Sequence, residues 1–257
     1  MGATTDIIKD ISAKEFSAVY ITCTAANLIV YESEDDLAHI ECRNVPEGSE
    51  VEALGDILRI KLKRPSVLDI VLRDPFRQAT CKVGLPGKLY ESFNADIGLG
   101  NAVIGAVKCE SANIRSGQSN LKIEDMKVQK LTRLESGVGN VTITGLESGP
   151  LEIKSGVGNV KAENTSTAGL DIAGGTGNIR FDGKVQGNIS VKGGVGDVDL
   201  VLHEDPSLHS GKYSLKTSHG IGKVNIEYIR DTNEEADAAE TKDQADIGDA
   251  AEQGDTE

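Results

Sequence analysis

The 257-residue sequence has little of what a thick globular core needs. It contains no tryptophan, four phenylalanines and five tyrosines, whereas glycine occurs 29 times. A core without large aromatic side chains must be thin and filled by Val, Ile, Leu and Ala. This composition favours short strands that turn often at glycine, and it argues against a large helical or mixed domain.

Long apolar runs and clustered cysteines are also missing. No stretch approaches 18 consecutive apolar residues, and no basic segment followed by an apolar one stands at the N-terminus. The sequence therefore predicts no signal peptide, no insertion into a membrane and a cytoplasmic location. The four cysteines form no Cys-x-x-Cys pair, and they are Cys23, Cys42, Cys81 and Cys109. Their spacing predicts buried small hydrophobes instead of a metal site or a disulfide framework.

Positive charge is scarce, and the negative charge is concentrated at one end. The net charge is −14, of which residues 231–257 carry −10 through eleven acids and one base. The rest of the chain is nearly balanced, so there is no basic patch for nucleic acid or for an anionic membrane surface. Residues 231–257 bury no apolar area, and we expect a disordered acidic tail.

What the sequence does have is a repeated phrase. Ser-Gly-Val-Gly-Asn-Val at residues 136–141 returns, with small changes, at 155–160, 174–179 and 193–198. The anchor positions of these four copies are 19 residues apart, and equivalent positions extend the series to seven units. The anchors are Asn101, Asn120, Asn140, Asn159, Asn178, Asp197 and Lys223. Such a regular period indicates a repeat architecture.

The apolar columns of the seven units coincide. Positions one and three residues after each anchor are apolar, and positions eight and six residues before it form a second, largely apolar pair. Each unit therefore has two short strands with one inward face, which it cannot bury alone. Stacking the units buries that face, so the sequence predicts an all-β, single-chain β-solenoid with 19-residue coils.

The rest of the chain divides around this repeat. Alternating segments at 16–23, 28–31, 39–42 and 57–62 predict strands without a visible period. We expect an N-terminal extension at 1–12, a β-rich N-terminal part of the solenoid at 13–80, regular repeats at 81–230 and the acidic tail at 231–257. The anchor column has a structural explanation, because Asn tolerates tight turns and bonds its equivalents in neighbouring coils. The predicted turn ladder consists of Asn101, Asn120, Asn140, Asn159, Asn178 and Asp197.

Residues that carry chemistry form no convincing site. The closest match to a calcium-binding nonapeptide, residues 193–198, places its acid one position early, and the glycine phrases lack the features of a nucleotide loop. His203, His209 and His219 lie around an insertion and are weak zinc candidates; a solvated loop is the favoured interpretation. The sequence therefore predicts no catalytic residue and no cofactor. A carbohydrate-active enzyme on a β-helix stays an unfavoured alternative.

The segment Cys81–Pro86, followed by repeated Ser-Gly-Val-Gly-Asn-Val phrases with Leu-x-Ile before them, resembles a bacterial family. The resemblance is to the toastrack-type β-strand-repeat proteins, described as "putative adhesins" of unknown function, and covers residues 10–230. It implies a β-solenoid without known catalytic residues, and some relatives accompany cell-envelope-stress systems. We therefore expect a non-catalytic scaffold that binds an unidentified protein, linked to envelope-stress signalling. The alternative is a surface adhesin exported without a classical signal; the sequence does not predict the oligomeric state.

Overall fold

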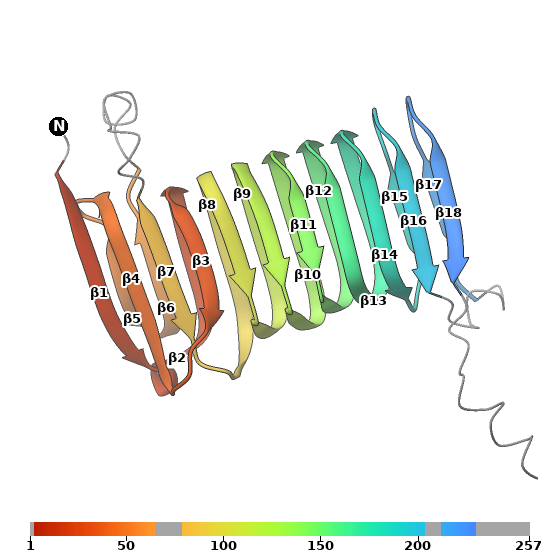
Figure 1. The fold of residues 1–257 in the computed structure, drawn as a ribbon. Helices are drawn as coiled ribbons and strands as arrows, with labels where there is room; N and C mark the ends of the chain where they lie inside the picture. Colours follow the sequence, from red (N-terminus) through yellow and green to blue (C-terminus); the bar gives the residue numbers. More distant parts are fainter. Residues whose placement is uncertain (1–2, 65–78, 204–211, 230–257) are drawn as a thin grey trace, which may run out of the picture.

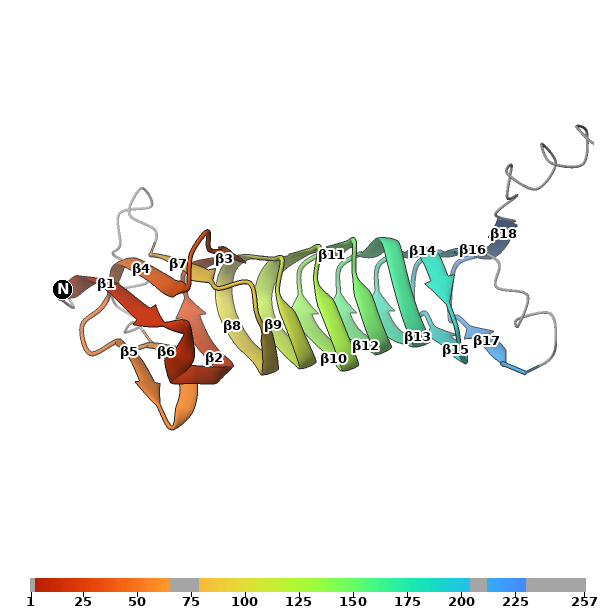
Figure 2. The same ribbon diagram turned by 90° about the horizontal axis from the view of Figure 1, so that it is seen from below.

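The computed structural model describes residues 3–64, 79–203 and 212–229, which form eighteen strands and one short 3-10 helix, Ala13–Glu15. The strands lie side by side along an elongated body, with the N-terminus at one end and the last strand at the other (Figure 1). The view turned by 90° shows successive coils stacked along the same axis (Figure 2). The predicted all-β solenoid is confirmed. The acidic tail lies outside the described residues.

The regular coils form two walls joined at corners. Three long strands, β8 (Leu89–Gly105), β9 (Lys108–Glu124) and β13 (Val160–Thr176), pass around a corner and contribute to both walls. The first wall continues through β10 (Lys127–Val138), β12 (Glu147–Val157), β15 (Ile189–Lys192) and β17 (Leu215–Ser218). The second wall continues through β11 (Val141–Thr144), β14 (Ile179–Val185), β16 (Val198–His203) and β18 (Val224–Ile229).

All the pairings between these coils are parallel, and they follow the predicted columns. Val141 lies opposite Val160, which lies opposite Ile179, and the same column continues to Val198 and Val224. The inward side chains fill one narrow core: Ile143, Ala162 and Phe181 are all fully buried. Burial of each large aliphatic side chain contributes roughly 1.5–3 kcal/mol. The 19-residue period therefore sets the register, and the stacked columns stabilise it.

The N-terminal strands do not follow the chain in space. They are β1 (Thr4–Ser12), β2 (Phe16–Ala25), β3 (Asn27–Glu32), β4 (Leu37–Pro46), β5 (Glu50–Leu54), β6 (Asp56–Leu62) and β7 (Thr80–Leu85). The coil of β2 and β3 stacks directly on β8, and the later strands β6 and β7 pair with its other side. The chain thus returns past its own first coil, which explains why this part shows no period in the sequence.

Antiparallel strands cover the outer side of this end. β5 pairs with β6 on the first wall, while β4 pairs with β7 and β1 pairs with β4 on the second. Residues 4–12, expected within an N-terminal extension, are thus an edge strand of the second wall. The four segments predicted as strands between residues 16 and 62 all fall within observed strands.

Candidate functional site

A column of exposed side chains runs along the corner where the repeated phrase passes from the first wall to the second. The central residue of the phrase is exposed: Val138, Val157 and Val195 expose 50%, 51% and 47% of their surface. Equivalent residues of successive coils are in register. We call this column the corner ridge; its members are Ala25, Leu99, Gln118, Val138, Val157, Thr176, Val195 and Ile221.

Close packing of the coils requires the glycines beside the ridge. A Cβ at Gly137 would stand 2.6 Å from the carbonyl oxygen of Gly117, and one at Gly139 would stand 2.1 Å from that of Ser119. Gly139 also has a φ of +136°, which L side chains rarely adopt. Ridge side chains such as Val138, Val157 and Val195 consequently stand between two glycines, so they protrude from the corner.

The apolar character of the ridge is not a requirement of the turn. Gln118 and Thr176 occupy the same column and are exposed, so the corner forms with a polar side chain at this position. Strand propensity explains a preference for β-branched residues, but threonine satisfies that preference as well as valine does. Exposed apolar side chains gathered on one surface mark a contact surface more often than a fold requirement. Here Val138 and Val157 are neighbours, and Thr176 separates them from Val195.

A shallow groove of about 530 Å³ lies on the first wall beside the ridge. Its lining comes from three successive coils and consists of Arg115, Ser116, Gly117, Glu135, Ser136, Gly137, Lys154, Ser155 and Gly156. Glu135 lies between two cations: its carboxylate oxygens are 3.4 Å from Arg115 Nε and 3.9 Å from Lys154 Nζ. Two cations thus share one carboxylate, and this groove carries an excess of one positive charge.

The predicted turn ladder lies at the same corner, on the other side of the ridge. The side-chain oxygen of Asn140 accepts a hydrogen bond of 3.0 Å from the backbone N–H of Asn159, and the pattern repeats from Asn120 to Lys223. Between Asn101 and Asn120 the bond joins the two side chains, at 3.3 Å. The bonds from Asn120 to Lys223 satisfy backbone donors at the turn, which is a structural role.

Sequence reasoning missed the first member of this ladder. The side-chain oxygen of Asn27 accepts from the backbone N–H of Asn101 at 2.9 Å, although the two residues are 74 positions apart. Asn27 is the first residue of β3, and the residues that follow it pair with those after Asn101. The 19-residue period does not reach it, because the intervening strands are inserted between the two coils in sequence but not in space.

Two of the three histidine candidates, His203 and His219, lie among the described residues, and they form no metal site there. His203 Nε2 lies 2.9 Å from Asp182 Oδ1, His219 is exposed after β17, and His209 lies outside the described residues. Over residues 3–64, 79–203 and 212–229, no group of three His, Cys, Asp or Glu side chains has an arrangement suited to a metal ion.

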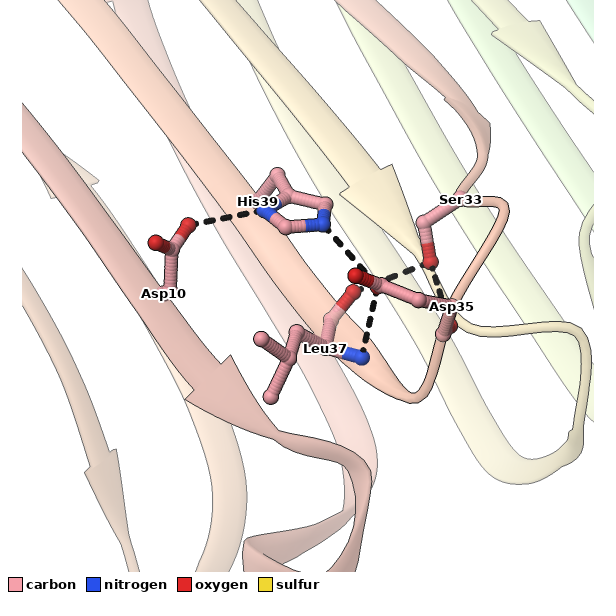
Figure 3. Close-up of polar contacts among 5 residues, drawn as sticks. All are labelled: Asp10, Ser33, Asp35, Leu37 and His39. Carbon is pink, nitrogen blue, oxygen red and sulfur yellow. Dashed lines mark hydrogen bonds and ion pairs between the residues drawn. The ribbon is translucent and has the colours of Figure 1, made fainter.

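A different histidine joins two acidic residues at the N-terminal end. His39 Nδ1 lies 2.7 Å from Asp10 Oδ1, and its Nε2 lies 2.9 Å from Asp35 Oδ1 (Figure 3). The hydrogen bonds to Asp10 and then to Asp35 raise the pKa of His39 above its ordinary value of 6.5. The backbone N–H of Leu37 is the main cause of the lowered pKa of Asp35.

This polar cluster braces the edge strand and has no catalytic arrangement. Asp10 belongs to β1, Asp35 to the turn after β3, and His39 to β4, so the ring ties three segments together. Both ring nitrogens contact carboxylates, and neither is directed at a hydroxyl or thiol that it would activate. The acidic turn that contains Asp35 lies four residues before His39 in the sequence. The contact of His39 with Asp10 depends on the pairing of β1 with β4 and has no such local signal.

The fold and the corner define a class of protein: a flattened β-solenoid with an exposed apolar ridge. Comparison with known families makes this more specific, since the Toastrack DUF4097 profile matches residues 18–253. The chain belongs to this family. In the described part of the chain, no helix is long and apolar enough to span a bilayer.

One solved structure shares the fold, and a second is less similar. A "putative adhesin" from Bacteroides fragilis is 19% identical, with a TM-score of 0.60 over 89% of this chain and 99% of its own. A "putative lipid binding protein" from Parabacteroides distasonis is 13% identical, with a TM-score of 0.41 over 89% of this chain and 98% of its own. No curated protein matches the chain.

Proposed function

We propose that this protein is a non-catalytic binding protein that contacts another protein through the corner ridge. The observation that carries the proposal is the row of exposed Val138, Val157 and Val195, in a column where Gln118 and Thr176 show that polar residues also fit. Burying such a row against a partner removes apolar surface from water, which stabilises the complex by about 25 cal/mol for each Å² buried. The protruding position between glycines leaves the side chains accessible to that partner.

The chemistry of the corner narrows the kind of partner. The ridge contains no charged residue, while the neighbouring groove has Arg115 and Lys154 sharing Glu135. A complementary partner is a protein segment that places an apolar row on the ridge and a carboxylate over the two cations. The description of the Bacteroides fragilis protein as a "putative adhesin" supports a contact role, whereas the envelope-stress link and cytoplasmic location stay predictions from sequence.

Threonine substitutions at the ridge test the proposal without disturbing the fold. In Val138→Thr/Val157→Thr, each new residue is one that the column already holds at position 176. The experiment compares proteins cross-linked to wild type and to this variant in the native cell, and the matched control is Val103→Thr, on an outward position of the second wall. We expect the ridge variant to lose at least tenfold of one specific partner that wild type and control retain.

The outcome that contradicts the proposal is equally specific. If the ridge variant and wild type bring down the same partners in equal amounts, the ridge is not the contact surface. Thermal melting of all three proteins is the accompanying control, because an unchanged melting temperature assigns the lost binding to the ridge and not to unfolding.

A further inference from the structure

Two of the four cysteines face each other inside the N-terminal end. Cys42 of β4 and Cys81 of β7 are directly opposite in the antiparallel register, and both are fully buried. Their sulfur atoms are 2.8 Å apart, in thiol-to-thiol contact. Nonbonded heavy atoms usually pack at roughly 3.5–4.0 Å, so this is a close pair.

The backbone arrangement suits a covalent bond between the two sulfurs. Directly opposite residues of antiparallel strands have Cα atoms about 4.5–5.5 Å apart. A disulfide spans Cα separations of about 4.4–6.8 Å. The bond therefore needs only a small adjustment of the two side chains, without a change in strand register.

The other two cysteines are placed differently. The thiol of Cys23 donates to the carbonyl oxygen of Ala26 at 3.4 Å. Burial, and after it the nearby Cys42, raise the pKa of Cys23 to about 12. Burial likewise raises the pKa of Cys109 to about 12. Cys109 follows the start of β9, in the regular coils, and is not in the β4–β7 pair.

We propose that Cys42 and Cys81 form an intramolecular disulfide when the chain folds in the presence of a small-molecule disulfide such as oxidised glutathione. One protein thiolate attacks a glutathione sulfur, forming a mixed disulfide and releasing one glutathione thiolate. The second protein thiolate then attacks the protein sulfur of the mixed disulfide and releases the second glutathione. Two protons leave the cysteines and two electrons reduce the glutathione disulfide.

The timing of the reaction follows from burial. The hydrogen bond with Cys42 and the burial of the site raise the pKa of Cys81. Since the thiolate is the attacking species, the folded and reduced protein reacts slowly. The bond therefore forms while the N-terminal strands are still open, and afterwards it fastens β4 to β7.

Refolding with a defined redox buffer tests the pair. The full chain is unfolded, refolded in oxidised and reduced glutathione, and treated with iodoacetamide in denaturant. Trypsin alone leaves Cys23 and Cys42 in one peptide, because no Lys or Arg lies between residues 15 and 42, so a glutamate-specific protease is added. We expect a linked pair of peptides containing Cys42 and Cys81, with Cys23 and Cys109 alkylated.

Stability provides a second measurement. The bond closes a loop of about forty residues, and the oxidised protein should melt about 10 °C above the reduced one. Cys42→Ala/Cys81→Ala should show no difference between the two conditions, while Cys109→Ala should keep it. Four alkylated cysteines after oxidative refolding, or a bond that involves Cys23 or Cys109 instead, would overturn the proposal.

Discussion

The two ends of the described solenoid differ in how far other strands cover their outermost coil. At the N-terminal end, β5 and β4 pair antiparallel with β6 and β7, and β1 pairs antiparallel with β4. The inward residues of the coil of β6 and β7, such as Leu58 and Ile60, are fully buried. At the other end, the last described coil has the same parallel register as the others, yet Ile226 and Tyr228 are 36% and 46% exposed.

The difference shows what stacking supplies and what it does not. A coil is buried from both sides only when a neighbour lies on each side, so a repeat protects its interior members and leaves its last member half-covered. Strands that depart from the repeat are therefore needed where an end is to be closed. The N-terminal end has them, and over residues 212–229 the other end continues the repeat unchanged.

The largest difference in stability between the regular coils and the N-terminal end is expected when a glycine is replaced by alanine. Gly158 in the regular corner has a φ of +138°, and a Cβ there would stand 2.1 Å from the Gly139 carbonyl oxygen. Gly55, between β5 and β6, has a φ of +54° and no atom within 4 Å of such a Cβ. Gly158→Ala should lower the free energy of unfolding by about 4 kcal/mol, from backbone strain and overpacking together.

Gly55→Ala is the matched control, because an alanine there has a strained positive φ but no atom close to its Cβ. This substitution should lower the free energy of unfolding by about 1–2 kcal/mol. Urea unfolding followed by circular dichroism measures both. Equal costs at the two sites would show that coil-to-coil contact is not what requires glycine at the corner.

The same substitution at one column position measures the burial that stacking provides. Ile143 and Ile226 both lie three residues after their anchors, but Ile143 is fully buried and Ile226 is 36% exposed. Ile143→Ala should lower the free energy of unfolding by about 3 kcal/mol, through lost burial and the cavity left behind. Ile226→Ala should lower it by less than about 1 kcal/mol in the same urea experiment, since the side chain of Ile226 is partly exposed.

A cost at Ile226 as large as that at Ile143 would contradict this comparison. It would mean that something outside the described residues covers the last coil. The two variants remove the same atoms from the same strand position, so the difference between them reports the neighbouring coil alone.

The regular coils were predictable because their information is local and periodic. An anchor every 19 residues fixes which residues pair, and the two-residue alternation fixes which side chains face inward. The N-terminal end has the alternation but not the 19-residue period: Asn27 bonds to Asn101, 74 residues later, and Cys42 meets Cys81 only through an antiparallel return of the chain. No fixed separation in the sequence predicts contacts between segments that lie so far apart along the chain.

The corner ridge was missed for a different reason. Thr132, Leu134 and Ser136 alternate inward along β10, and strict alternation would also bury Val138. Val138 is instead 50% exposed, because the chain turns out of the wall at the glycines before and after it. A period-two pattern describes a strand, and it fails at the corner where the strand ends.

The smallest expected effect concerns the brace at the N-terminal edge, and it depends on pH. His39 has a raised pKa when folded, so its contribution is fully present below its unfolded pKa of about 6.5 and is lost as pH rises through the folded value. Asp35 has a lowered pKa, so its contribution is present above about 3.8 and is lost as pH falls through the folded value. The brace should therefore be strongest between about pH 4 and pH 6.5.

Amide hydrogen exchange across β1 checks this expectation, after correction for the intrinsic pH dependence of exchange. Protection of β1 should fall as pH rises above about 6.5 in wild type, and this fall should be absent in His39→Gln, whose side chain does not titrate. Protection of β17, at the opposite end and without this histidine, is the internal reference. If β1 loses protection with pH equally in both proteins, His39 does not hold the edge strand, and the antiparallel pairing with β4 alone closes this end.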